Sequence, residues 1–223
     1  LEKMWDKTEE NISIPATDME HYAEHPDVIF VCVKGYSLQE TIPFIKRIAR
    51  KNTIVIPVLN IYGTGGKMQK ELPDLLVTDG CIYVSANIKE PGKLLQHGQI
   101  LHIVFGVRDK AEFRPELKEI QKDLCDSHID GTLSENIRRE ALEKFSYVSP
   151  IGAAGLYYHA TAADFQKEGE ARELFKTMVK EIAALAEAMG VPFQKDMAEV
   201  NLKILSNLAP EATTSMQRDI MAG

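Results

Sequence analysis

The chain has 223 residues, of which 44% are apolar, and its 26 Lys and Arg against 33 Asp and Glu give a formal net charge of −7. This composition is typical of globular domains, and the length leaves room for two of them. The acidic balance argues against nucleic acid as a partner, because binding phosphates needs clustered cations. The longest apolar run, about six residues within 28–33, is far short of the roughly 18 that a membrane-spanning helix needs.

The cysteines and histidines predict neither a disulfide framework nor a metal site. The three cysteines, Cys32, Cys81 and Cys125, are odd in number and contain no Cys-x-x-Cys pair, so a reducing cytoplasm is the expected compartment. The six histidines show no metal-ligand spacing beyond His21 and His25, which we interpret as surface residues. The chain opens with neither methionine nor a signal-peptide pattern, and we expect that its natural start is missing.

Two short runs rich in β-branched residues, 27–33 and 53–59, predict parallel strands buried on both faces of a sheet. Between them, residues 37–40 have the Ser-x-x-Glu pattern of a capping box, and apolar residues continue at helical spacing to residue 49. The sequence therefore predicts a strand, a helix and a second strand. Such a unit is typical of open α/β folds.

Two further runs, 81–88 and 100–105, flank the turn sequence at 90–92 and predict an antiparallel or mixed pair at the end of the sheet. The glycine-rich segment 63–67 has some likeness to a phosphate-binding loop. It lacks the first glycine and the Ser or Thr of that motif. We therefore expect a flexible turn there.

The sequence becomes charged and helix-periodic from about residue 110, which predicts an α/β domain over 1–109 and an all-α domain over 110–223. Residues 132–135 have the pattern of a second capping box and predict the start of a helix there. The clearest helix is expected over 168–189. Gly190 would end it.

Polar residues follow both predicted strands of the first domain. Lys34 comes directly after the first strand and Asn60 directly after the second. Open α/β sheets bind ligands beyond the carboxyl ends of their strands, where a cation and an amide suit a phosphate-bearing cofactor. The alternative is that Lys34 is a solvated charge and Asn60 a turn former.

Lys144 lies within a stripe of apolar residues on a predicted helix. It follows Ile137 by seven positions and sits between Ala141 and Val148 on nearly the same face. Either its ammonium reaches the edge of the domain, or it points into a cleft and acts as a general acid. A general acid contributes a rate factor on the order of 100 to 10,000.

The chain from about residue 26 to its end resembles the ketopantoate reductase family in six motifs, at 26–34, Asn60, 90–92, 105–106, 143–145 and 214–219. The most specific are the spacing from Lys34 to Asn60 and the ending Ser-Met-x-x-Asp. The resemblance implies an incomplete Rossmann-type domain for NADP, followed by a helical domain of the 6-phosphogluconate-dehydrogenase-like type. From the resemblance we also expect a homodimer formed through the helical domain.

The resemblance implies a role for each matching residue. Lys34 corresponds to a lysine near the cofactor, and Asn60 to an asparagine that holds nicotinamide, ribose and substrate. Lys144 corresponds to the general acid, and Ser215 to a serine that contacts the substrate carboxylate, although Ser215 could instead be a helix N-cap. The implied reaction is NADPH-dependent reduction of 2-dehydropantoate, or a related 2-keto acid, in pantothenate biosynthesis.

The sequence departs from the family pattern in four places. The Gly-x-Gly-x-x-Gly segment that binds pyrophosphate is absent, and so is the Thr-Glu that follows the last motif. Ile61 replaces the glycine after Asn60, and Val148 and Gly152 replace asparagines that contact ketopantoate. Two alternatives remain beside the leading interpretation: a related reductase for another keto acid, and a non-catalytic family remnant that serves as a binding or dimerisation module.

Overall fold

The computed structural model describes residues 2–5 and 8–221, with side chains over 11–221. The chain forms two compact units, Leu1–Ile137 and Arg138–Gly223. The division falls later than the composition change near residue 110. The reason is that the segment 110–133 belongs to the first unit, where α3 (Glu116–Asp126) packs in the core and β8 (Asp130–Leu133) pairs with β7.

The first unit contains a three-stranded parallel sheet in the order β3 (Val28–Val31), β4 (Ile54–Pro57) and β5 (Leu76–Val77). This confirms the two predicted parallel strands. All four residues of β4 are buried. Its central position explains why its sequence is continuously apolar, since helices cover both faces.

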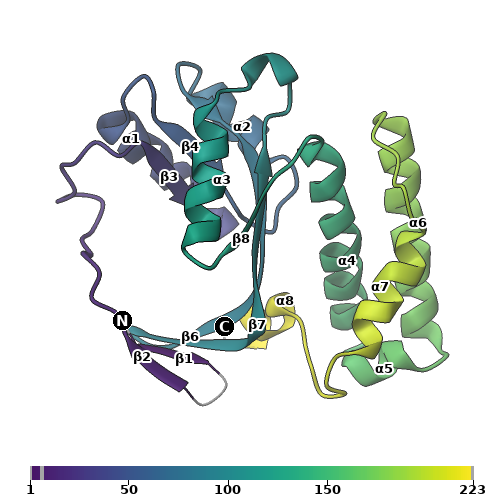
Figure 1. Cartoon of the computed structure of the whole chain (residues 1–223). Coiled ribbons are helices and arrows are strands. Elements are labelled where there is room, and N and C mark those ends of the chain that lie inside the picture. The colour runs from purple at the N-terminus through teal and green to yellow at the C-terminus, as the bar shows by residue number, and fades with distance from the viewer. Residues whose placement is uncertain (1, 6–7, 222–223) are drawn as a thin grey trace. The chain divides into compact units, whose positions relative to one another are not determined.

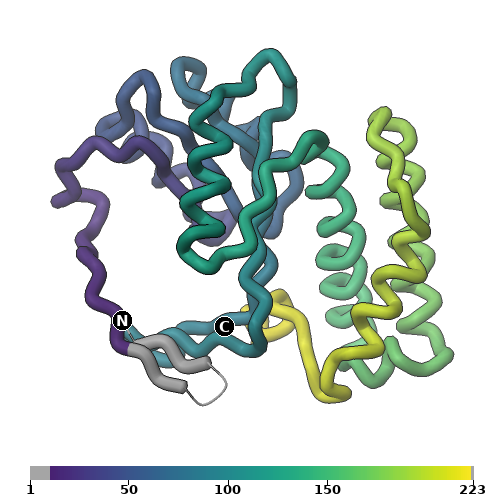
Figure 2. The backbone as a smooth tube through the Cα atoms, in the orientation of Figure 1, coloured from purple at the N-terminus to yellow at the C-terminus, as the bar shows by residue number. Residues whose placement is uncertain are grey.

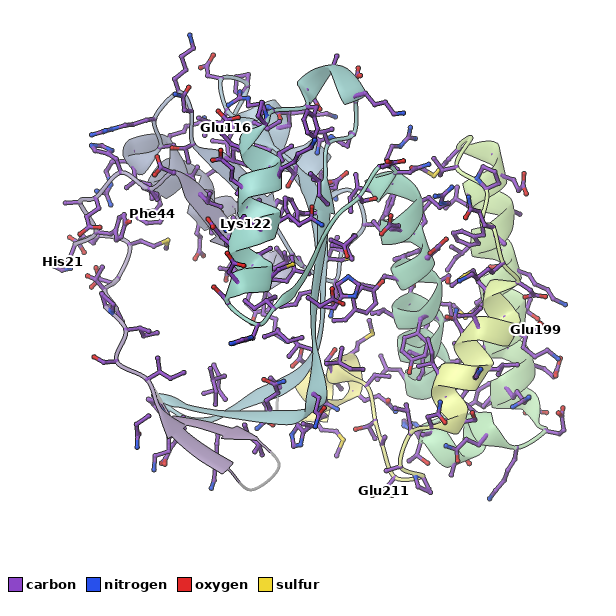
Figure 3. All side chains as sticks on the ribbon, viewed as in Figure 1. His21, Phe44, Glu116, Lys122, Glu199 and Glu211 are labelled. Atoms are coloured by element: carbon purple, nitrogen blue, oxygen red, sulfur yellow. The ribbon has the colours of Figure 1, made fainter. Side chains whose placement is uncertain are left out.

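Alternate residues of β4 pack against different helices, whose places are labelled in Figure 1. Val55 packs with α1 (Leu38–Ile48) and α2 (Thr64–Glu71), whereas Ile54 and Ile56 pack with α3. Lys122 lies on the solvent side of α3 (Figure 3), where it pairs with Asp126 at 2.6 Å. The α/β architecture expected for this part of the chain is therefore present.

Two helix starts differ from the sequence-based predictions. A 3₁₀ turn, η1 (Gly35–Ser37), precedes α1, and no hydrogen bond joins the described Ser37 side chain to the helix, so the predicted capping box is absent there. The segment expected as a flexible turn instead begins α2, with Gly63 at φ 76° as the preceding residue. A left-handed residue at that position favours glycine.

A long antiparallel hairpin of β6 (Asp79–Glu90) and β7 (Lys93–Gly106) confirms and extends the predicted pair (Figure 2). Beside β7 lie β8 at one end, and β1 (Glu2–Trp5) with β2 (Thr8–Asn11) at the other. A short turn, η2 (Lys110–Glu112), follows β7. The capping box predicted at 132–135 is wrong, because Thr132 pairs with Val104 inside β8.

The second unit is all-helical, as predicted. Its elements are α4 (Ile137–Tyr157, which starts at the last residue of the first unit), α5 (Ala162–Gln166), α6 (Glu170–Ala188), α7 (Met197–Ser206) and α8 (Ser215–Met221). α6 confirms the helix predicted over 168–189, and Gly190 ends it at φ 71°. No helix in the described ranges has both the length and the apolar character needed to cross a bilayer.

Candidate functional site

The loops that follow β3 and β4 carry the two residues expected to hold a cofactor. Val31 and Pro57 are partners in the parallel register, and the N–H of Val58 donates to the carbonyl of Val31 at 3.0 Å. The strands therefore end at the same edge of the sheet. Lys34 and Asn60 follow these ends and are both exposed.

Gly35 and Ile61 bring these two loops into contact. A Cβ on Gly35 would collide with Cδ1 of Ile61, so residue 35 can approach this closely because it is glycine. The Thr64 hydroxyl donates to the Ile61 carbonyl at 2.8 Å and fixes the second loop. Since Lys34 and Asn60 are the residues directly before this contact, the structure brings their loops together, while their role in cofactor binding stays a prediction.

A buried carboxylate occupies the N-terminus of α2. Asp79 accepts hydrogen bonds from the N–H groups of Gly65 and Gly66, and its Oδ1 lies 3.5 Å from Nη1 of Arg108. Burial raises the pKa of Asp79, and the Arg108 charge and the two N–H groups oppose part of this rise. Because a carboxylate of the protein already faces the positive end of α2, this helix terminus does not offer a phosphate site.

Lys144 is buried, with 9% of its surface exposed. Of the lysines whose side chains the structure describes, it is the only one in the buried class. This agrees with its predicted place among apolar residues of α4. Burial also raises the pKa of its neighbour Glu143, against the opposing charge of Arg139. A lysine held away from bulk water is suited to proton donation, which remains its predicted role.

The side chain of Gln217 fixes the short helix α8 to the last turn of α4 and to the loop that follows it. Its Nε2 donates to the carbonyls of Ala160 at 2.8 Å and Gly155 at 3.1 Å. Its Oε1 accepts from the N–H of Thr214 at 2.9 Å, and the Thr214 hydroxyl accepts from the N–H of Gln217 at 3.2 Å. Thr214 is therefore the N-cap, and the alternative interpretation of Ser215 as the cap is wrong.

Ser215 is exposed at the first position of α8, and the next residue, Met216, contacts an apolar section of α4. A Cβ on Gly152 would meet Cε of Met216 at 3.3 Å, so α8 packs directly on this turn. Gly152 follows Lys144 by eight residues, which is a rise of about 12 Å along a helix. Val148 lies between them, and neither Val148 nor Gly152 carries a polar side chain.

Two of the four predicted site residues lie in each compact unit. The loops of Lys34 and Asn60 meet in the first unit. In the second unit Lys144 lies on α4 and Ser215 on α8, and these two helices are in contact at Gly152 and Met216. The buried Asp79 was not predicted from the sequence. Its only signal was an aspartate, followed by glycine, two residues before the predicted strand 81–88.

Two sequence models of one family match the chain. The model described as "Ketopantoate reductase PanE/ApbA" matches residues 3–110, and the model described as "Ketopantoate reductase PanE/ApbA C terminal" matches residues 136–223. The uncharacterized oxidoreductase YkpB of Bacillus subtilis is 18% identical over 197 residues, which are 88% of this chain and 65% of that protein. The chain thus spans about two thirds of the length of this relative.

Solved structures show the same fold. A dimeric ketopantoate reductase from Staphylococcus aureus has a TM-score of 0.83 at 21% identity, covering 99% of this chain and 73% of that one. D-mandelate dehydrogenase, in a ternary structure with NADH and anilino(oxo)acetate, has a TM-score of 0.84 at 16% identity, covering 100% and 72%. At these identities the likeness establishes the α/β and helical architecture.

Proposed function

The chain belongs to the ketopantoate reductase family, and we propose from this membership that it takes part in the NADPH-dependent reduction of a 2-keto acid to the 2-hydroxy acid. The observation that carries the proposal is the burial of Lys144, the residue that the resemblance assigns as general acid. The substrate would be 2-dehydropantoate or a related keto acid. In this proposal the first domain binds the cofactor and the second domain binds the substrate.

The residues of the first unit fit one end of a dinucleotide. Lys34 offers an ammonium and Asn60 an amide, both exposed where two parallel strands end, and the loops that carry them touch through Gly35 and Ile61. We assign them to the nicotinamide and ribose side of NADP. The pyrophosphate needs other groups, since Asp79 faces the N-terminus of α2. Bound NADPH would supply the hydride.

Two residues of the second unit would act on the keto acid. The ammonium of Lys144 hydrogen-bonds to the ketone oxygen, stabilises the negative charge that develops there, and donates the proton that completes the hydroxyl group. Ser215 donates a hydrogen bond to the substrate carboxylate. Because Lys144 is buried, few water molecules compete for this hydrogen bond and its electrostatic effect is stronger than in bulk solvent.

Replacing Lys144 tests the acid role. Lys144→Ala should lower kcat by a factor on the order of 100 or more, measured as NADPH oxidation with 2-dehydropantoate, while the Kd of NADPH stays nearly unchanged. Lys180→Ala, an exposed lysine of α6, is the matched control. An unchanged kcat in Lys144→Ala would remove the acid role.

Replacing Lys34 tests the cofactor site separately. Lys34→Ala should raise the Kd of NADPH, measured by fluorescence titration, and the exposed Lys51 serves as control. Equal affinity in the variant and the wild type would disprove the assignment. The same titration with NADH decides the cofactor preference, which matters because the similar D-mandelate dehydrogenase was solved with NADH.

A second candidate function is the reduction of a keto acid with an apolar side chain. Val148, Gly152 and Met216 present no amide or hydroxyl group near Ser215, and a substrate hydroxyl would find no side-chain partner among these three. Comparing kcat/KM for 2-dehydropantoate with branched and aromatic 2-keto acids separates the two candidates. Lack of turnover with every keto acid would favour the third alternative, a non-catalytic binding or dimerisation module.

We also propose that the protein forms a homodimer through its helical domain, because the similar reductase from Staphylococcus aureus is dimeric. Sedimentation equilibrium tests this. A single species with the mass of one chain over the micromolar range would contradict the dimer.

A further inference from the structure

Pro150 interrupts the hydrogen bonding of α4 at a buried point. In an α-helix each carbonyl accepts from the N–H four residues later, and proline has no N–H. The carbonyl of Ser146 therefore lacks its usual helical donor. Ser146 is 0% exposed, so water is excluded and another donor is required.

Asn201 of α7 supplies that donor. Its Nδ2 donates to the Ser146 carbonyl at 3.0 Å and to the Ser146 hydroxyl oxygen at 3.1 Å. The hydroxyl itself donates to the Glu143 carbonyl at 2.7 Å, which makes its oxygen an acceptor for Asn201. The orientation of the amide follows from this network, because the opposite orientation would direct Oδ1 toward two acceptors.

Burying the amide of Asn201 at this position costs folding free energy. Asn201 is 1% exposed and belongs to the buried face of α7, whose other buried residues are Met197, Ala198 and Leu205. Its Oδ1 has no hydrogen-bond partner among the described residues. Burying an amide whose oxygen has no partner is unfavourable. Any favourable effect of Asn201 on the structure therefore comes from its two donated hydrogen bonds.

These hydrogen bonds hold α4 at Ser146, which lies between Lys144 and the contact of α4 with α8 at Gly152. Lys144 lies two residues before Ser146, and residues two apart point in nearly opposite directions from a helix axis. Holding Ser146 against α7 therefore sets the direction of the Lys144 side. On the other side of Pro150 lies Gly152, where α8 packs beside Ser215.

We propose that Asn201 is a positioning residue, whose amide closes the gap that Pro150 opens in α4 and thereby sets the direction of Lys144 relative to Ser215. A proline within a helix favours a bend, and the path of the bend depends on what satisfies the freed carbonyl. The proposal rests on the proposed acid role of Lys144. Asn201 touches neither substrate nor cofactor in this scheme.

A double-mutant cycle with Asn201→Ala and Pro150→Ala tests the proposal in the full-length protein. Asn201→Ala should lower kcat roughly ten- to hundredfold, as expected for a misplaced catalytic group, with the KM of NADPH unchanged. The alkaline limb of the kcat–pH profile, where Lys144 loses its proton, should shift. Pro150→Ala restores an N–H for the Ser146 carbonyl. Adding Asn201→Ala to it should therefore cost little further kcat.

Glu199→Gln is the matched control, since Glu199 is an exposed residue of the same helix (Figure 3). Wild-type kcat and pH profile in Asn201→Ala, or losses that multiply in the double variant, would overturn the proposal. If Asn201→Ala does not fold, the double variant is compared with Pro150→Ala. A further large loss of kcat in the double variant would then overturn the proposal. Lys144→Ala distinguishes the two hypotheses: a normal kcat there removes both, whereas a low kcat there with a normal Asn201→Ala removes only the positioning role.

Discussion

Replacement of Gln217 should detach α8 from α4 and weaken substrate binding. Gln217→Ala leaves the Ala160 carbonyl, in a residue that is 3% exposed, without its hydrogen-bond donor. An unsatisfied buried carbonyl costs about 1–3 kcal/mol, and the lost bonds to Thr214 add about 0.5–1.5 kcal/mol, so about 1.5–4.5 kcal/mol is lost in all. The Gly155 carbonyl keeps the N–H of Ala160 at 2.9 Å and adds little.

Even the lower end of this range increases the detached population of α8 about tenfold. A helix of seven residues has little stability on its own, so detachment should also unwind it and move Ser215. We expect a raised KM for the keto acid, an unchanged Kd for NADPH, and faster amide hydrogen exchange in α8. Global stability should change less, because Gln217 is the one buried residue of α8 in the described part of the chain.

Two further variants make this prediction precise. Gln217→Glu keeps the side-chain size and the acceptor for Thr214 but, when ionised, cannot donate to Gly155 and Ala160, so it should raise the KM as well. Ile220→Ala changes a residue of α8 that is 62% exposed and should have no effect. Wild-type KM and wild-type exchange in both Gln217 variants would refute the reasoning.

Two predictions concern the buried carboxylate of the first unit. Gly65→Ala should destabilise the protein by about 1–3 kcal/mol in urea titrations, because its Cβ would collide with the Thr78 carbonyl and with Arg108. Gly66→Ala is the control and should be tolerated, because the nearest atom to its Cβ would lie 3.9 Å away. Equal losses of stability in the two variants would contradict the prediction. Because the pKa of Asp79 is raised in the folded protein, the folded state binds its proton more tightly than the unfolded state, so its contribution to stability is fully present below the unfolded pKa of about 3.9 and is lost as the pH rises through the folded pKa. The unfolding free energy of the wild type minus that of Asp79→Asn should therefore fall with rising pH in this window, and a constant difference would be evidence against it.

Periodicity predicted the elements whose structure depends on local pattern. The continuous apolar run of β4 and the stripe of α6 both follow from burial at a regular period, and both were identified with ends within two residues. The place of Lys144 among apolar residues could be predicted for the same reason, since a charge on an apolar stripe is visible in the sequence. Pattern is sufficient where a residue's environment is set by its own helix or strand.

Local sequence patterns could not predict the elements whose structure depends on contacts with residues far away in the chain. Thr132 has the sequence of a cap, yet it lies in β8, because pairing with β7 outweighs the local signal. The segment from Gly63 has the composition of a turn, yet it begins α2, because Asp79 satisfies the first N–H groups from a distant position. Both errors come from partners that are far away in the sequence.

The helix α4 combines both situations. Its apolar stripe predicts a helix, but three of its residues are poor helix formers, and each is compensated by a group from another helix. These pairs are Pro150 with Asn201, Gly152 with Met216, and Gly155 with Gln217. The same three contacts hold α4 against α7 and α8. The residues that weaken α4 as an isolated helix are therefore the ones through which α7 and α8 fix the positions of Lys144 and Ser215. Replacing them with good helix formers would stabilise the isolated helix but remove the contacts that set these positions.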